Sequence, residues 1–147
     1  MPLRADGRRV AADNLHITLL FMGNIAAHQR DGLCTTSISA PGFSLTLDKL
    51  GWWRGPRVIW LAPTTVPAEI LSLVSNLAEL AADRGIELDN RPYQPHMTLA
   101  RNITRKPGLP DPAPVHWQVD RFCLVESITS QAGPRYTVLK TWPLTST

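Results

Sequence analysis

One short pattern of side chains able to do acid–base chemistry occurs twice in the sequence. Leu15-His16-Ile17-Thr18-Leu19 is the first copy, and Pro95-His96-Met97-Thr98-Leu99 is the second. Because side chains alternate between the two faces of a β-strand, the histidine and the threonine of each copy would share one face. Two such strands side by side would line one cleft with two imidazoles and two hydroxyls.

These groups suit hydrolysis of a cyclic phosphodiester. A base must take a proton from the attacking water while an acid protonates the leaving alkoxide. Imidazole titrates at about pH 6.5, so a neutral and a protonated histidine can coexist at neutral pH. Threonine hydroxyls can donate to the non-bridging oxygens, where charge builds up in the transition state. This scheme requires no metal ion and no cofactor, and no carboxylate cluster lies near either motif in the sequence.

The elements expected to hold these residues are strands and one amphipathic helix. Apolar residues predict strands over 14–21, 43–47, 57–61, 96–101, 115–128 and 136–142. The second and third of these are expected to pair as a hairpin. Apolar residues at helical spacing predict a helix that begins at Pro67 and ends at Gly85. A further helix over 25–39 has a poorer period. Together these elements predict an α+β fold with mostly antiparallel strands.

Length and composition fit a single domain over residues 1–147. Hydrophobic residues make up 44% and charged residues 18%, which predicts a packed core. No stretch approaches the roughly 20 apolar residues that span a bilayer, and the basic start lacks the apolar run of a secretory signal, so a cytoplasmic location is expected. The net charge of +3 suits RNA, although many soluble domains are as basic. Cys34 and Cys123 lack metal-ligand spacing and are interpreted as reduced thiols.

At the two motifs the sequence resembles the 2H phosphoesterase superfamily, which is named for its paired His-x-Thr/Ser motifs. Within it, the similarity is to the bacterial and archaeal RNA 2′,3′-cyclic phosphodiesterases, once described as 2′–5′ RNA ligases. The resemblance runs from Gly7 to Leu144. Its blocks are 14–23, 43–51, 56–61, 91–101 and 124–127, with Tyr136.

This resemblance implies a two-lobed α+β fold with pseudo-two-fold symmetry, in which each lobe supplies one motif strand to a central cleft. It implies conversion of 2′,3′-cyclic phosphates on RNA ends or nucleotides to 2′-phosphates, with His16 as general acid and His96 as general base. Thr18, Thr98 and Arg101 would hold phosphate oxygens, the arginine as a two-pronged donor.

Aromatic and basic residues near the motifs are candidates for contacts with the rest of an RNA. Trp52 and Trp53 follow Gly51 in a predicted turn; one of them could stack on a nucleobase, and at least one is expected in the core. Tyr93 could border the cleft. Four basic residues could form a rim for an RNA strand, or could be solvated loop charges: Arg54, Arg57, Arg105 and Lys106. His28 and His116 lie outside the motifs and are interpreted as surface or loop residues.

The N-terminus departs from the family pattern. Members usually begin with a strand of the type Arg-Leu-Phe-Phe-Ala-Leu and a long helix, whereas only fifteen residues precede His16 here. Loss of these elements would uncover apolar surface and a sheet edge, which a homodimer could cover. Two alternatives stay open. One is a non-catalytic binder of nucleotides or RNA on the same fold, and the other is an enzyme for a different cyclic phosphate or for the reverse, ligating direction.

Overall fold

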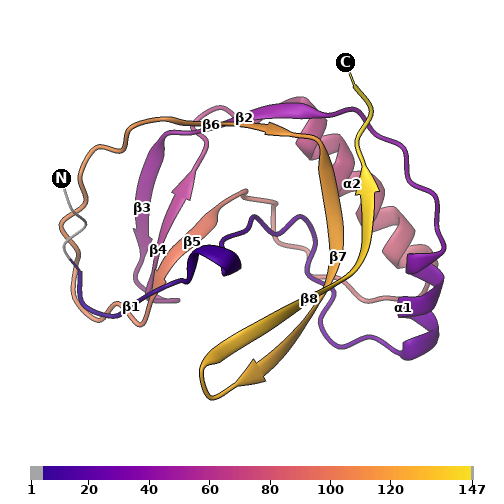
Figure 1. The fold of residues 1–147 in the computed structure, drawn as a ribbon, viewed down its shortest axis with the longest axis horizontal. Helices are drawn as coiled ribbons and strands as arrows, with labels where there is room; N and C mark the ends of the chain where they lie inside the picture. The colour runs from indigo at the N-terminus through magenta and orange to yellow at the C-terminus, as the bar shows by residue number, and fades with distance from the viewer. Residues whose placement is uncertain (1–4, 147) are drawn as a thin grey trace. The chain divides into compact units, whose positions relative to one another are not determined.

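The chain folds into two compact units in a computed structural model that describes residues 5–146 (Figure 1). The first unit comprises the described part of residues 1–18 with 45–66 and 94–117, and the second comprises 19–44, 67–93 and 118–147. Strands β2 (Phe43–Leu47) and β6 (Val115–Val119) pair with each other, and the division between the units falls within both. The elements are helices and antiparallel sheets, so the predicted α+β class is confirmed.

The first unit is built on a four-stranded sheet. Its strand order is β1 (Arg8–Arg9), β5 (Met97–Arg101), β4 (Val58–Ala62) and β3 (Lys49–Trp53). One face packs on a hydrophobic cluster whose members are Ile59, Ala100 and Ile103, with Leu50, Trp52 and Leu109 against them. The opposite face is therefore available for polar side chains.

The predicted hairpin between residues 43–47 and 57–61 is wrong. β4 pairs instead with β3, and β2 pairs with β6. The reason lies at Gly51, which reads as a strand breaker but sits opposite Trp60 in the β3–β4 ladder. A Cβ at this glycine would lie 2.0 Å from the Trp60 ring, so the glycine makes room for an indole rather than for a turn. Trp52 and Trp53 consequently lie in a strand.

A β-bulge in β5 decides which of its side chains face the core. Ile59 lies opposite Ala100, but the next residue, Trp60, lies opposite Thr98. Leu99 is therefore an extra residue in β5, and it interrupts the alternation of side chains. Ala100 joins Ile59 in the core, and the next residue along β5 is turned to the face that Thr98 occupies.

The segment around the first motif is less regular than predicted. Residues Ala12–Asn14 form a 3-10 turn, and within 14–21 only Ile17 makes a bridge, to Met97. A strand over 14–21 is thus wrong. The chain passes from the first unit to the second after Thr18.

The second unit contains two helices and a long hairpin. Helix α2 (Ala68–Asp83) confirms the predicted helix but begins one residue later, with Pro67 at its N-cap, and buries Ile70, Leu73 and Ala81. Gly85 follows with φ +75°, which confirms the expected glycine stop. No helix within residues 5–146 combines the length and hydropathy needed to cross a bilayer.

Helix α1 (Ala27–Cys34) packs beside the end of α2, since Leu33 and Ala81 share a cluster with Leu124 of β7 (Figure 1). The predicted strand over 115–128 is divided at Asp120, whose carbonyl accepts from the Leu144 N–H. The second part is β7 (Arg121–Ser130), which pairs along its length with β8 (Gly133–Pro143).

Candidate active site

A pocket of about 280 Å³ lies within the first unit and contains both copies of the motif. Its lining residues are His16, Thr18, Trp53, Pro56, Val58, His96, Thr98 and Arg101. The structure thus brings the predicted catalytic and phosphate-binding residues together with Trp53. The resemblance implied one motif from each lobe, whereas both copies belong to the same unit.

The two copies meet through a single antiparallel bridge between Ile17 and Met97. In antiparallel register, a bridge at these central residues places His16 opposite Thr98 and Thr18 opposite His96. A local two-fold relation through the bridge therefore exchanges one copy with the other. Each imidazole has the hydroxyl of the other copy as its cross-strand neighbour.

Each histidine is oriented by a bond to its own chain. His16 Nδ1 lies 2.7 Å from the carbonyl oxygen of Asn14, and His96 Nδ1 lies 2.8 Å from that of Gln94. A carbonyl oxygen can only accept, so in both rings Nδ1 carries the hydrogen. The two rings therefore share one neutral tautomer, in which Nε2 carries the lone pair.

The ring of His96 has an aromatic neighbour in the pocket. The indole of Trp53 meets His96 edge to face, with ring centroids 4.6 Å apart and planes at 69°. Trp53 in turn lies 5.3 Å from the ring of Trp60, which crosses over Gly51. This series of contacts restrains the His96 ring. The sequence analysis did not identify Trp60 as a support for the His96 ring. The only local signal for it was Gly51, a glycine followed directly by two tryptophans.

The β5 bulge explains why Arg101 reaches the pocket with Thr98, although the two are three residues apart. Its guanidinium has no ion pair or hydrogen bond to the part of the chain that the structure describes. A bidentate donor without a partner at this position suits a phosphate group.

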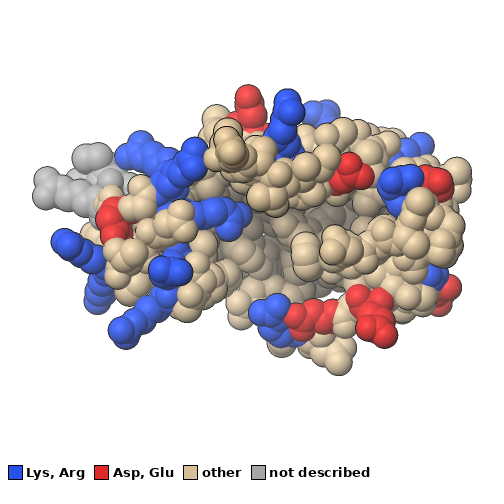
Figure 2. All heavy atoms as spheres, turned by 90° about the horizontal axis from the view of Figure 1, so that it is seen from below, with Lys and Arg blue, Asp and Glu red and all other residues tan. Residues whose placement is uncertain are grey.

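The charges of the chain are divided unequally between the two units. Among the described residues the first has eight Lys and Arg against four Asp and Glu, and the second has six against eight. Figure 2 shows Lys and Arg side chains gathered over the sheet of the first unit, on the left of that view, with few acidic groups among them. The pocket therefore opens in a surface that favours anions.

Three other predicted positions are not among the residues that line the pocket. Tyr93 belongs to the second unit, and burial raises the pKa of its phenol above the usual range. It is not among the lining residues. His116 is exposed on β6, where its Nδ1 lies 3.2 Å from the hydroxyl of Thr46, and His28 is exposed on α1. Both are surface residues, as expected.

Comparison with known proteins gives a family match over most of the chain. A family model described as the 2′-5′ RNA ligase superfamily matches residues 3–130. RNA 2′,3′-cyclic phosphodiesterase of Escherichia coli (strain K12) is 41% identical over 143 residues, which cover 95% of this chain and 81% of the relative. The Bacillus subtilis (strain 168) protein of the same name is 31% identical over 133 residues, covering 82% and 72%.

Solved structures show the same fold. The crystal structure of E. coli LigT complexed with 3′-AMP matches with a TM-score of 0.88 and 40% identity, over 99% of this chain and 84% of that one. The crystal structure of TT0787 of Thermus thermophilus matches with a TM-score of 0.73 and 27% identity, over 92% and 81%.

Proposed function

Because the chain belongs to the 2′-5′ RNA ligase superfamily, we propose that it is an enzyme that hydrolyses 2′,3′-cyclic phosphates on RNA ends or nucleotides to 2′-phosphates. One observation supports this beyond the family: the two motifs meet at an antiparallel bridge, and the same ring nitrogen is fixed in each histidine. Relatives named RNA 2′,3′-cyclic phosphodiesterase, at up to 41% identity, support the reaction class.

In the proposed reaction His96 is the general base. Its neutral Nε2 takes a proton from water while the water oxygen forms a bond to phosphorus. His16 is the general acid, and its Nε2 proton passes to O3′ as the P–O3′ bond breaks. The phosphate remains on O2′, and exchange with solvent restores both rings. The choice of acid and base rests on the family resemblance, because the two-fold relation makes the copies similar.

Thr18, Thr98 and Arg101 are proposed to hold the non-bridging oxygens. Each threonine neighbours the histidine of the other copy, so the hydroxyls lie between the attacking and leaving sides, where the non-bridging oxygens would be. Donors placed in advance stabilise charge that develops in the transition state without having to reorganise. Arg101 would add a charged, two-pronged donor to the same oxygens, and the exposed part of Trp53 would stack on the base.

The first test is turnover of 2′,3′-cyclic AMP in EDTA by the wild-type chain and its histidine variants. His16→Ala and His96→Ala should each lower kcat about 10³-fold, because each removes one proton transfer. His28→Ala and His116→Ala are matched controls outside the pocket and should keep wild-type turnover. Phosphorus NMR should show the product phosphate on O2′.

The pH dependence adds a second readout in the same assay. Because one imidazole must be neutral while the other is protonated, kcat/KM should rise and fall with pH, and each single variant should lose one limb. Full turnover by both variants would refute the two-histidine scheme. Calorimetric binding of the nucleotide without hydrolysis would support a non-catalytic binder, and joined ends with a 5′-hydroxyl RNA would reveal ligation.

A further inference from the structure

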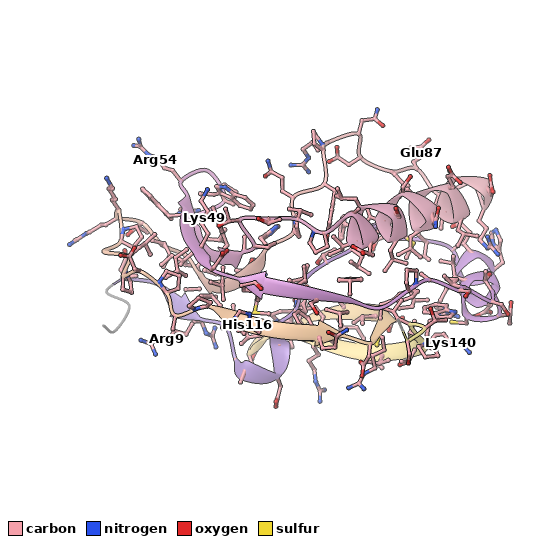
Figure 3. All side chains as sticks on the ribbon, turned by 90° about the horizontal axis from the view of Figure 1, so that it is seen from above. Arg9, Lys49, Arg54, Glu87, His116 and Lys140 are labelled. Atoms are coloured by element: carbon pink, nitrogen blue, oxygen red, sulfur yellow. The ribbon has the colours of Figure 1, made fainter. Side chains whose placement is uncertain are left out.

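The turn that joins β3 to β4 forms one wall of the pocket. Trp53 at its start, Pro56 within it and Val58 at its end all line the pocket. Arg54 and Arg57, the two charged residues of the turn, are exposed. Figure 3 labels Arg54 at the tip of this turn and Lys49 nearer the other end of β3. A substrate strand that extends from the pocket over this turn would therefore pass the two arginines.

Arg57 is held in a backbone conformation that its side chain disfavours. Its φ is +60°, in the left-handed region that glycine adopts readily and other residues rarely. Two hydrogen bonds fix it there: its N–H donates to the Trp53 carbonyl at 2.9 Å, and its carbonyl accepts from the Ile103 N–H at 3.0 Å. Glycine would make both bonds without strain. An arginine at a position better suited to glycine points to a role for its side chain.

The two turn arginines are also uncompensated. Neither forms an ion pair or a side-chain hydrogen bond within residues 5–146. Arg105 lies in the loop whose Ile103 N–H bonds to the turn. It differs from the two turn arginines because Asp6 lies close to it. The pKa of Asp6 is lowered mainly by a hydrogen bond from Thr104, and the charge of Arg105 contributes. The turn therefore adds two uncompensated positive charges next to residues that line the pocket.

We propose that the β3–β4 turn binds the RNA strand that precedes the cyclic end, with Arg54 and Arg57 contacting its phosphates. The inference rests on the proposed function, and it adds the residues that would favour an oligonucleotide with a cyclic end over a free cyclic nucleotide. A mononucleotide has no phosphate beyond the reacting one, so it cannot use these contacts. An oligonucleotide offers phosphodiester groups that two exposed guanidinium groups can bind.

The test compares kcat/KM for a tetranucleotide ending in a 2′,3′-cyclic phosphate with kcat/KM for 2′,3′-cyclic AMP. Arg54→Ala and Arg57→Gly should each lower the ratio of the two about 5-fold at low salt, as expected for one charged phosphate contact. Each should also make the oligonucleotide rate less sensitive to salt. Lys49→Ala removes the same charge from the same unit, away from the turn, and should keep the wild-type ratio.

Arg57→Gly has a second readout, because it relieves backbone strain. Its thermal midpoint should equal or exceed that of the wild type while its preference for the oligonucleotide falls. An unchanged ratio in both arginine variants, or an equal fall in Lys49→Ala, would overturn the proposal. So would a lowered midpoint with equal loss on both substrates, which would make Arg57 structural. If the wild type hydrolyses neither substrate, the proposed function itself fails, which is a separate result.

Discussion

The two units of the chain meet different physical demands. The first holds the unusual features among the described residues: both non-glycine residues with positive φ, Arg57 and Asn102, and both buried indole N–H groups without a partner, those of Trp52 and Trp60. The second holds a regular 16-residue helix, a long β-hairpin and the ion pairs Arg30–Asp31, Arg91–Asp89 and Arg121–Asp120.

This contrast shows where the chain gives up local stability. Buried N–H groups without acceptors and left-handed residues both destabilise a fold, and here they lie in the unit that contains the pocket. Proteins commonly break local rules at functional sites and make up the stability elsewhere. We therefore expect mutations in the second unit to change mainly the free energy of unfolding, and mutations in the first to change mainly turnover.

The largest expected effect on stability is in helix α2. Leu73 is 2% exposed, so Leu73→Ala should lower the free energy of unfolding by about 2–5 kcal/mol, since it leaves a cavity. Leu71 is on the same helix but 45% exposed. Leu71→Ala should therefore change the free energy of unfolding by about 0.5 kcal/mol or less. Urea denaturation measures both. A lower kcat per folded molecule in Leu73→Ala would break the division between the units.

Two glycines give an intermediate and sharper comparison. In Gly51→Ala the new Cβ would press on Trp60 and, through Trp53, displace the His96 ring, so kcat on 2′,3′-cyclic AMP should fall about 10- to 100-fold. Gly85→Ala strains a residue at φ +75° in the second unit and should cost about 1 kcal/mol of stability with kcat unchanged. Steady-state kinetics and thermal unfolding of both variants separate these results. Equal kcat in the two would show that the aromatic contacts do not position His96.

The site was more predictable from sequence than the sheet that holds it. The repeated His-x-Thr motif needs only period-2 alternation to place its polar groups on one face, and that rule holds locally at His96 and Thr98. Helix α2 was predictable for a similar reason, because its apolar spacing and the residues at its two ends agree. Each of these predictions depends on neighbours within a few positions in the chain.

The errors came from contacts between distant segments. From the sequence alone Gly51 is interpreted as a strand breaker, because only the structure shows Trp60 opposite it. The bulge at Leu99 is defined only by the pairing of β5 with β4. The strand predicted over 14–21 is reduced to the single bridge between Ile17 and Met97. Register and unit boundaries are set by tertiary packing, which overrides local propensity.

The smallest expected effect concerns two aspartates, one in each unit. Two hydrogen bonds from Thr64, at 2.8 and 2.9 Å, lower the pKa of Asp48, and hydrogen bonds from Arg91, led by its side chain at 2.7 Å, lower that of Asp89. Because the folded-state pKa is lowered, each carboxylate stabilises the fold at pH values above the ordinary pKa of aspartate. This stabilisation is lost as pH falls through the folded-state pKa.

The partners of the two aspartates differ in charge, so salt should distinguish them. At about 1 M salt the Debye length is about 3 Å, which screens the exposed Asp89–Arg91 pair but leaves the neutral hydrogen bonds to Asp48 largely intact. Asp48→Asn should therefore flatten the acid side of the stability curve at both low and high salt, and Asp89→Asn only at low salt. Urea midpoints between pH 5 and pH 2.5 measure this. If both variants respond to salt alike, hydrogen bonds rather than charge account for the stabilisation by both aspartates. The two units would then not differ in this respect.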